Sequence, residues 1–277
     1  MGNYVNVRGH RIYYEKVGES GEPIVMIHGI PTSSFLWRHV QTLLATKYQT
    51  YALDLLGYGK SDKPAKSDYT LSTQAQVVAG FIDELGLKKP VIACHDQGGG
   101  VGQVFACRYP EKLSAFIIMN GVCYDYWPVV EVRAMAKILR LGIMASIVYK
   151  LGFLLDMFMA MAIRQGAWRR NAFTEDIIRE YLKPWQGREG KRALVRVAAG
   201  PTEKETLSLD LSTIRVPSLI IWAEQDAFLP MEAAERLKKD LGGPAQLKTI
   251  PECGHFLQED KPEEVASLMT AFLQEQE

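Results

Sequence analysis

The stretch from Ile92 to Gly100 contains the aspartate that is best placed to do chemistry. It reads Ile92-Ala93-Cys94-His95-Asp96-Gln97-Gly98-Gly99-Gly100, an apolar strand-like run that leads into small residues, and a helical pattern follows from Val101 to Tyr109. This layout is typical of a nucleophile elbow, a sharp turn whose small neighbours give clearance to a projecting central side chain. The central residue is Asp96. The alternative is an ordinary aspartate N-cap at a glycine-rich helix start.

An acid and a histidine that could support such a nucleophile follow later in the chain. Asp226 lies four residues past Trp222, at the end of an apolar run, and His255 follows the last strand-like run. Nucleophile, acid and histidine is the chain order that accompanies the elbow. Each of the last two alone is more often a structural residue. Together the three predict a catalytic triad of Asp96, His255 and Asp226.

The loop His28-Gly29-Ile30-Pro31 directly follows the first core strand-like run. In enzymes with the elbow, this loop supplies a main-chain N–H that pairs with the N–H of the residue after the nucleophile. We therefore expect Ile30 and Gln97 to form an oxyanion hole through their main-chain N–H groups. One such donor is worth roughly 3 kcal/mol of transition-state stabilisation. The ring of His28 is expected to bond loop backbone.

Short buried strands must position these residues. Their near-continuous hydrophobicity favours parallel strands that are covered by helices on both faces. A leading hairpin precedes them, over residues 4–7 and 11–17. The strand-like runs cover residues 24–28, 49–54, 90–94, 115–119, 216–222 and 246–250.

Strand patterns stop between residues 121 and 212, where the chain becomes Met-rich, aromatic and helical in period. We therefore predict a core domain of residues 1–120 and 213–277 and a helical cap domain of residues 121–212. The cap would lie over the carboxyl ends of the strands, where open α/β sheets bind their ligands. Its methionines and aromatic residues are expected to line the underside: Met135, Met144, Phe153, Met157, Phe158, Met159, Met161 and Trp168.

Composition and charge exclude several function classes. Lys plus Arg equals Asp plus Glu at 32 each in 277 residues, so no surplus of positive charge favours a nucleic-acid partner. The four cysteines have no metal-site spacing and are expected to be reduced thiols; they are Cys94, Cys107, Cys123 and Cys253. The glycine run lacks a phosphate-loop Lys and the G-x-G-x-x-G spacing, so we expect no metal, nucleotide or flavin cofactor.

One apolar stretch, from Leu141 to Ile163, is about as long as a membrane span. Lys150, Asp156 and two internal glycines favour two shorter helices instead, so no membrane partner is expected. The N-terminal residues are polar, without an apolar signal segment, and the expectation is a cytoplasmic monomer or homodimer.

Several motifs together resemble the haloalkane dehalogenase and epoxide hydrolase branch of the α/β-hydrolase superfamily. The resemblance implies an α/β-hydrolase fold with a mostly parallel eight-stranded sheet, flanking helices and a helical cap inserted after the sixth strand. The motifs are His28-Gly29-Ile30-Pro31-Thr32-Ser33-Ser34-Phe35-Leu36-Trp37-Arg38, Asp54-Leu55-Leu56-Gly57-Tyr58-Gly59-Lys60-Ser61-Asp62-Lys63-Pro64, His95-Asp96 and His255-Phe256-Leu257-Gln258-Glu259-Asp260.

A carboxylate nucleophile implies attack at carbon, an alkyl ester of Asp96, and hydrolysis of that ester by water that His255 activates. Some haloalkane dehalogenases place the acid one core strand earlier, which in this chain is directly after the strand-like run 115–119. Asn120 stands at that place, and it has no charge to stabilise an imidazolium, so Asp226 is favoured as the acid. The predicted function is therefore hydrolysis of a small apolar organic substrate without a cofactor.

The substrate-reading positions depart from the dehalogenases. These enzymes usually have a Trp after the nucleophile and often an Asn in the His-Gly loop, where this chain has Gln97 and Ile30; the Arg that fluoroacetate dehalogenases place there is also missing. Epoxide hydrolases use cap tyrosines as acids, for which Tyr149 and Tyr181 are the first candidates among Tyr124, Tyr126, Tyr149 and Tyr181.

Trp37 and Phe256 are further substrate-binding candidates. An epoxide substrate is slightly favoured over an alkyl halide. Ester or lactone hydrolysis, in which Asp96 only activates water, and non-catalytic ligand binding on the same fold remain as alternatives.

Overall fold

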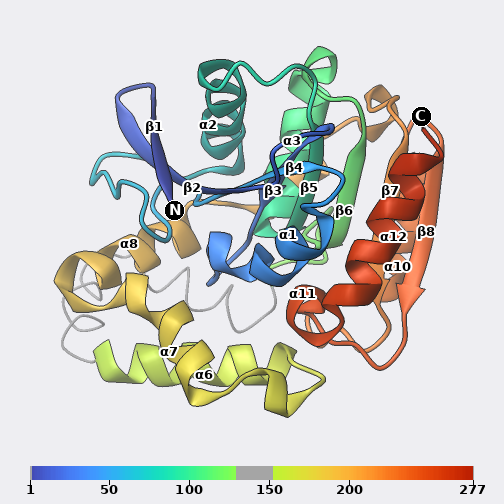
Figure 1. The fold of residues 1–277 in the computed structure, drawn as a ribbon. Helices are drawn as coiled ribbons and strands as arrows, with labels where there is room; N and C mark the ends of the chain where they lie inside the picture. The colour runs from blue at the N-terminus through green and yellow to red at the C-terminus, as the bar shows by residue number, and fades with distance from the viewer. Residues whose placement is uncertain (1, 129–151, 277) are drawn as a thin grey trace.

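The computed structural model describes residues 2–128 and 152–276, and it contains a single sheet of eight strands (Figure 1). The spatial order is β1-β2-β4-β3-β5-β6-β7-β8. β1 and β2 form an antiparallel hairpin, β2 pairs antiparallel with β4, and all other neighbours are parallel. This confirms the predicted sheet. The strands are β1 Asn3–Val7, β2 His10–Val17, β3 Pro23–Ile27, β4 Gln49–Leu53, β5 Val91–Asp96, β6 Phe116–Gly121, β7 Ser218–Ala223 and β8 Ala245–Ile250.

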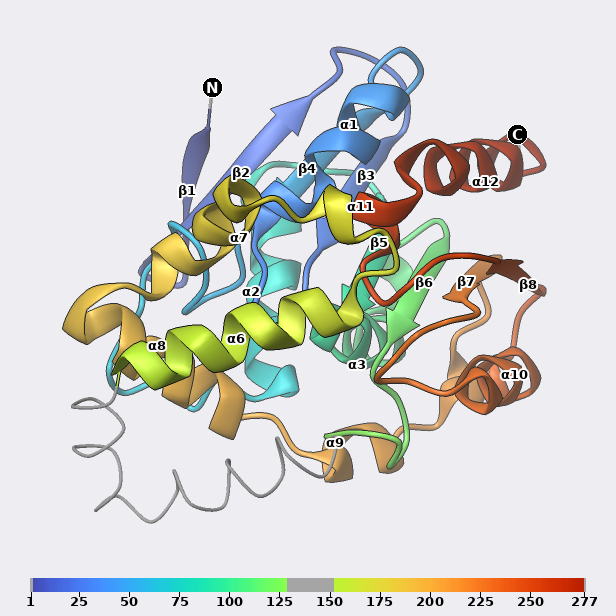
Figure 2. The same ribbon diagram turned by 90° about the horizontal axis from the view of Figure 1, so that it is seen from below.

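Helices cover both faces of the sheet, as Figure 2 shows. One face carries α1 (Arg38–Leu44), α11 (Leu257–Asp260) and α12 (Pro262–Gln274); the other carries α2 (Leu71–Glu84), α3 (Gln97–Arg108) and α10 (Met231–Asp240). Successive residues of a strand consequently enter different hydrophobic clusters. In β6, Phe116 and Ile118 pack on the α3 side, whereas Ile117 and Met119 pack on the α12 side. Two-sided burial explains why these strands read as continuous apolar runs.

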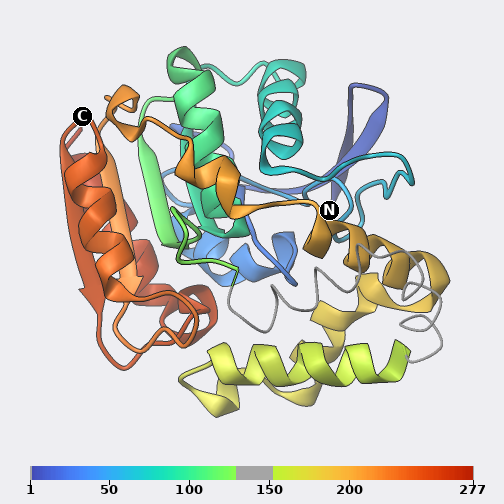
Figure 3. The same cartoon turned by 180° about the vertical axis from the view of Figure 1, so that it is seen from behind.

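The chain between β6 and β7 forms helices at one end of the sheet (Figures 1 and 3). Within its described residues these are α6 (Gly152–Gly166), α7 (Glu175–Leu182), α8 (Gly187–Ala199) and α9 (Glu203–Leu207). Of these, α6, α7 and α8 lie beyond the carboxyl ends of the strands, whereas α9 lies against α3 (Figure 3). Short 3-10 turns occur at η1 Ser34–Trp37, η2 Pro110–Lys112, η3 Arg170–Ala172, η4 Lys183–Trp185 and η5 Leu211–Thr213.

The junction between β5 and α3 differs from the sequence-based prediction in its boundaries. β5 continues to Asp96 and α3 begins at Gln97, so the glycine run is the first turn of the helix rather than a loop before it. Close packing explains this. A Cβ on Gly98 would lie 2.4 Å from the carbonyl oxygen of His28, and one on Gly99 would lie 2.5 Å from Cα of Gly121. The glycines let the helix start directly against the neighbouring strand ends.

No helix among residues 2–128 and 152–276 is long and apolar enough to span a membrane. Of the apolar stretch that begins at Leu141, residues 152–163 belong to α6. The rest of that stretch lies outside the described residues.

Candidate active site

Asp96 adopts a backbone conformation that residues other than glycine rarely occupy. Its φ is 52° and its ψ is −124°, a conformation that surrounding structure must hold in place. The main-chain carbonyl of Asp96 accepts the N–H of Val122 at 2.9 Å. The side chain makes no capping bond to α3. Instead, its Oδ1 accepts the main-chain N–H of Ile30 at 2.7 Å, so the carboxylate is presented at the carboxyl end of the sheet.

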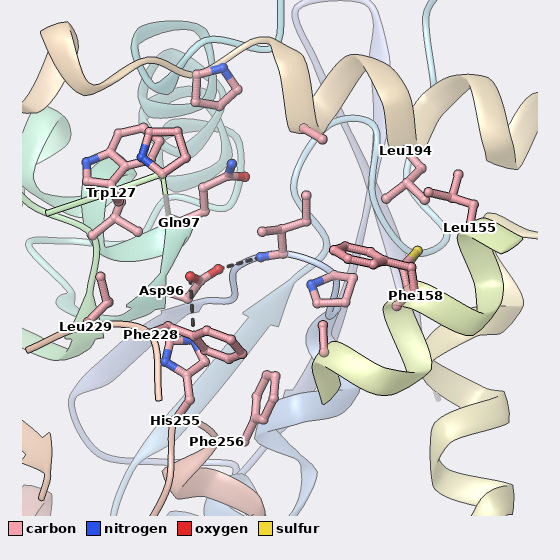
Figure 4. Close-up of a pocket in the computed structure, with 18 of the residues that line it drawn as sticks. Asp96, Gln97, Trp127, Leu155, Phe158, Leu194, Phe228, Leu229, His255 and Phe256 are labelled. Carbon is pink, nitrogen blue, oxygen red and sulfur yellow. Dashed lines mark hydrogen bonds and ion pairs between the residues drawn. The ribbon is translucent and has the colours of Figure 1, made fainter. Parts of the chain in front are cut away.

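His255 lies between the carboxylates of Asp96 and Asp226, and Figure 4 shows it on the Asp96 side. Its Nδ1 is 2.9 Å from Oδ2 of Asp226, and its Nε2 is 3.5 Å from Oδ2 of Asp96. The other oxygen of Asp226 accepts the N–H groups of Phe228 at 2.8 Å and Leu229 at 3.2 Å. These two bonds fix the Asp226 carboxylate, which in turn orients the imidazole with Nε2 toward Asp96.

The main chain of His255 is anchored on both sides. Its carbonyl oxygen accepts a hydrogen bond from Asn120 Nδ2 at 3.2 Å and pairs with His95 Nε2 at 2.8 Å. Asn120 Oδ1 accepts the N–H of Ala223 at 2.9 Å. Asn120 thus ties the end of β7 to the histidine loop. The sequence did not predict this role for His95 and Asn120, because their side chains bond main-chain groups that are more than one hundred residues away in the sequence.

The same loop is bonded to the end of α6. The N–H of His255 donates to the carbonyl of Gly166 at 2.7 Å. The buried carboxylate of Asp260 accepts N–H groups from Gly254 at 2.9 Å, Trp168 at 3.0 Å and Arg169 at 2.9 Å. One carboxylate therefore joins the histidine loop to the segment that follows α6.

The charges of these groups are strongly coupled. Burial alone would lower the pKa of His255, but the carboxylates of Asp226 and Asp96 outweigh it and raise that pKa to about 10. Burial acts to raise the pKa of Asp96, yet His255 and the N–H of Gln97 hold it below its usual value. Burial lowers the pKa of His95 to about 4, so this ring is neutral. The lowered pKa of Asp96 and the raised pKa of His255 both favour a carboxylate beside an imidazolium.

The loop after β3 meets Asp96 at very short range. A Cβ on Gly29 would lie 2.1 Å from Oδ1 of Asp96, so glycine is required for the approach of Ile30. Both ring nitrogens of His28 hydrogen-bond loop backbone, as predicted: Nδ1 pairs with the carbonyl of Gly29 at 2.8 Å, and Nε2 accepts the N–H of Leu55 at 3.1 Å.

A cavity of about 170 Å³ opens above Asp96 (Figure 4). Apart from Asp96, Gln97, His255 and the indole of Trp127, the described residues that line it are apolar. Trp127 Nε1 donates to Thr206 Oγ1 at 2.9 Å, so that donor is occupied. The apolar lining comprises Ile30, Pro31, Val122, Pro128, Leu155, Phe158, Met159, Ala162, Leu194, Val195, Ala198, Pro201, Phe228, Leu229 and Phe256. No trio of potential metal-binding side chains occurs in the described ranges.

The four candidate substrate-binding residues fall in different places. Phe256 lines the cavity. Trp37 lies outside the lining and is fully buried in the α12-side cluster. Tyr181 also lies outside it, because its hydroxyl donates to Glu259, which pairs with Arg38. Tyr149 lies outside the described residues.

The other cap tyrosines that the sequence offered, Tyr124 and Tyr126, do not line the cavity. The hydroxyl of Tyr124 donates to Asp240 Oδ2 at 2.8 Å, and Tyr126 packs against the core. Among the residues expected on the underside of the cap, Phe158 and Met159 do line the cavity. Phe153, Met157, Met161 and Trp168 are exposed. Met135 and Met144 are not in the described ranges.

The orientation of α6 explains this division. Its cavity side carries Leu155, Phe158, Met159 and Ala162, which follow a helical spacing, and the remaining apolar residues fall on other sides. The sequence could not orient the helix, because α6 is apolar around much of its circumference. Trp127, Leu194 and Phe228, which also line the cavity, had no pattern that marked them.

A profile of the alpha/beta hydrolase family matches residues 24–268. Mouse (Mus musculus) epoxide hydrolase 4 is 29% identical, over 99% of this chain and 79% of that protein. The cis-3-alkyl-4-alkyloxetan-2-one decarboxylase of Shewanella oneidensis is 27% identical over 99% and 89%, and haloalkane dehalogenase 2 of Mycobacterium bovis is 27% identical over 93% and 89%. A solved alpha/beta hydrolase fold protein from Burkholderia ambifaria superposes with a TM-score of 0.85 at 27% identity, covering 97% of both chains. These similarities confirm the family resemblance.

Proposed function

Because this chain belongs to the alpha/beta hydrolase family, we propose that it hydrolyses a small apolar organic molecule through an ester of Asp96. The proposal rests on the different partners of the two oxygens of this carboxylate. Oδ1 is held by the N–H of Ile30 at 2.7 Å, while Oδ2 faces Nε2 of His255 at 3.5 Å. A carboxylate held in this way can attack carbon with Oδ2 and keep Oδ1 in an oxyanion site.

The second step uses the same geometry. Once Asp96 is esterified its charge is gone, and the pKa of His255 falls because one of its two carboxylate partners is neutralised. Neutral His255 then takes a proton from water through Nε2, and the oxygen of that water attacks Cγ of the ester. The charge that develops on Oδ1 is met by the N–H groups of Ile30 and Gln97. The alcohol leaves, and Asp96 retains one oxygen from water.

An epoxide is the first substrate class. The apolar cavity suits a small hydrophobic ring compound, and the similarity to an epoxide hydrolase covers 99% of this chain. An alkyl halide is the second candidate, and one observation favours it. None of the tyrosines in the described part of the chain lines the cavity, and a departing halide, unlike an alkoxide, needs no acid.

Isotope transfer tests the covalent step. The enzyme, in excess over styrene oxide or hexyl bromide, completes a single turnover in heavy-oxygen water and is then digested for mass analysis. The peptide with Asp96 is expected to gain heavy oxygen. The peptide with Asp54, a buried carboxylate bonded to the N–H groups of Ser34 and Lys60, serves as the internal control and stays unlabelled.

Turnover with label only in the product would contradict the proposal and indicate that Asp96 activates water directly. A third result would be no turnover of epoxides, halides or activated esters above an Asp96→Ala variant, together with a ligand-dependent rise in melting temperature. That result would favour a ligand-binding protein.

A further inference from the structure

We propose that the exposed side of α6 docks on the surface of a lipid bilayer and that the cavity takes its apolar substrate from the lipid. This side, the outer face of α6, consists of Phe153, Leu154, Met157 and Met161. The helix would lie along the bilayer surface, which is a different contact from spanning it. Docking itself does not depend on the ester mechanism, whereas the supply of substrate from the lipid rests on the proposed function.

The outer face is a cluster of large apolar side chains in contact with solvent. Phe153 is 68% exposed, Leu154 39%, Met157 54% and Met161 60%. Their spacing along the helix places them on one side of it, and Figures 1 and 2 show that α6 lies at the outer edge of the insertion. Single exposed apolar residues are ordinary in proteins, but a contiguous patch of them marks an interaction surface.

The charged residues of α6 are engaged by other helices. Asp156 pairs with Lys191 of α8, and Arg164 pairs with Glu175 of α7. Both ion pairs therefore tie α6 to the rest of the insertion, and the outer face itself is uncharged. Such a surface has no charge with which to attract a nucleic acid or a charged protein. Its docking would be driven by the removal of apolar area from water.

The outer face continues into the cavity at Phe158. This side chain is 39% exposed and also lines the cavity, where Figure 4 shows it with Leu155. The next side of α6 is the cavity wall, with Leu155, Met159 and Ala162. An apolar surface thus leads from the outer face to the cavity. A protein bound to the outer face would lie across Phe158, whereas a bilayer would present dissolved apolar molecules to the same path, and this favours lipid as the partner.

Residues suited to the boundary between lipid and water follow directly after α6. Trp168 is 49% exposed, and Arg169 is exposed as well. Trp and Arg side chains combine an apolar body with a polar end, which suits them to the level of the lipid headgroups. The carboxylate of Asp260 holds the main-chain N–H groups of both residues, at 3.0 and 2.9 Å, and also that of Gly254 at 2.9 Å. The docked edge would therefore be fixed to the loop that carries His255.

Vesicle flotation tests the docking. The full chain is mixed with phosphatidylcholine vesicles, with or without phosphatidylglycerol, and the floating fraction gives the partition coefficient. The double variant Phe153→Gln, Met157→Gln is expected to lower this coefficient roughly 10- to 100-fold. The matched control is Leu43→Gln with Leu207→Gln, which changes two exposed leucines on α1 and α9, and it should stay within about 2-fold of the wild type. Because the outer face is uncharged, wild-type flotation should persist at high salt.

Turnover tests the supply of substrate from the lipid. Decene oxide and decyl bromide dissolve in the vesicles, whereas propylene oxide and bromoethanol stay in water. The double variant should turn over the vesicle-bound substrates more slowly, by the same factor as its loss of flotation. Its rates with the water-soluble substrates should equal those of the wild type, because Phe153 and Met157 lie outside the cavity lining. A general defect in folding would lower both sets of rates.

A wild-type protein that does not float, or a double variant that floats equally well, would overturn the docking. So would flotation that needs phosphatidylglycerol and disappears at high salt, because it would indicate charge-driven adsorption through another surface. A wild-type dimer that the double variant converts to a monomer, with no flotation of either, would assign the outer face to a second copy of this chain.

The supply of substrate can fail separately from the docking. Unchanged rates with vesicle-bound substrates in a variant that no longer floats would overturn the supply of substrate from the lipid. Flotation of the wild type without turnover of any substrate would reject the proposed function and support the docking alone.

Discussion

Asp226 and His255 lie 2.9 Å apart across the ends of two separate segments, and the same imidazole lies 3.5 Å from Asp96. The histidine therefore responds to two carboxylates at once. Its proton is held tightly while both are charged, and less tightly when Asp96 carries an alkyl group. This dependence leads to the first two predictions.

His255→Gln should convert the protein into a trap for its own intermediate. Asp96 keeps its bond to the Ile30 N–H and can still attack carbon, but no base remains to activate water. Ester hydrolysis should fall roughly 10²- to 10⁴-fold, and intact-protein mass spectrometry should show the alkylated chain after incubation with substrate. His39→Gln, a change at an exposed histidine on α1, is the control and should show no adduct. An unmodified His255→Gln protein that has consumed substrate would count against the ester.

The pH dependence of stability should reveal the His255 proton. Its pKa is raised from 6.5 to about 10 in the folded protein. A raised pKa means that the proton stabilises the fold; this contribution is complete below about pH 6.5 and is lost as the pH rises through about 10. We expect the free energy of unfolding to fall over this interval more steeply in the wild type than in Asp226→Asn. Urea titrations at several pH values measure the difference, and parallel curves would contradict it.

Asn120→Asp should weaken the fold without supplying a second acid. The Nδ2 group of Asn120 donates to the carbonyl of His255 at 3.2 Å and approaches that of Gly254 at 3.5 Å. A carboxylate there would face carbonyl oxygens with no proton to donate. We expect the free energy of unfolding to drop by about 1–3 kcal/mol, more at high pH, with no rescue of Asp226→Asn activity. Asn171→Asp, at an exposed site, should change stability by less than about 0.5 kcal/mol.

Lys191→Met should loosen two helices of the insertion. Lys191 of α8 is buried and pairs with Asp156 of α6. Removing the cation leaves a carboxylate that is only partly open to solvent, so we expect a loss of about 1–3 kcal/mol in unfolding free energy, discounted for that exposure. The exposed pair of Arg179 and Asp176 is the control, and Arg179→Met should cost less than about 0.5 kcal/mol. Replacing both partners, as Asp156→Leu with Lys191→Met, should restore most of the loss.

The sequence could predict those features of the fold and site that leave a pattern in neighbouring residues. The strands around Asp96 were visible because two-sided burial makes each a continuous apolar run, as in Phe116–Gly121. The elbow and the loop of Ile30 were visible because they need glycine at fixed places. Asp226 and His255 were visible because each ends or follows such a strand.

Contacts between distant side chains were not visible. The hydrogen bonds from Tyr58 to Gln97 and from Trp168 to Asp260 depend on the path that the loops take in the folded protein, and no local pattern predicts that path. Tyr181 shows the limit most clearly. It lies in a helix as predicted, but its hydroxyl donates to Glu259, which also pairs with Arg38, and Tyr181 does not line the cavity.

The bonds that join Gly166, Trp168 and Arg169 to the histidine loop bear on how this protein can be re-engineered. These bonds would constrain any exchange of the helices between β6 and β7 with those of a relative. Here a graft that ended before residue 166 would keep the carbonyl that receives the N–H of His255, whereas one that ended later would replace it. Chimeras should therefore carry residues 166–169 and 254–260 from one parent.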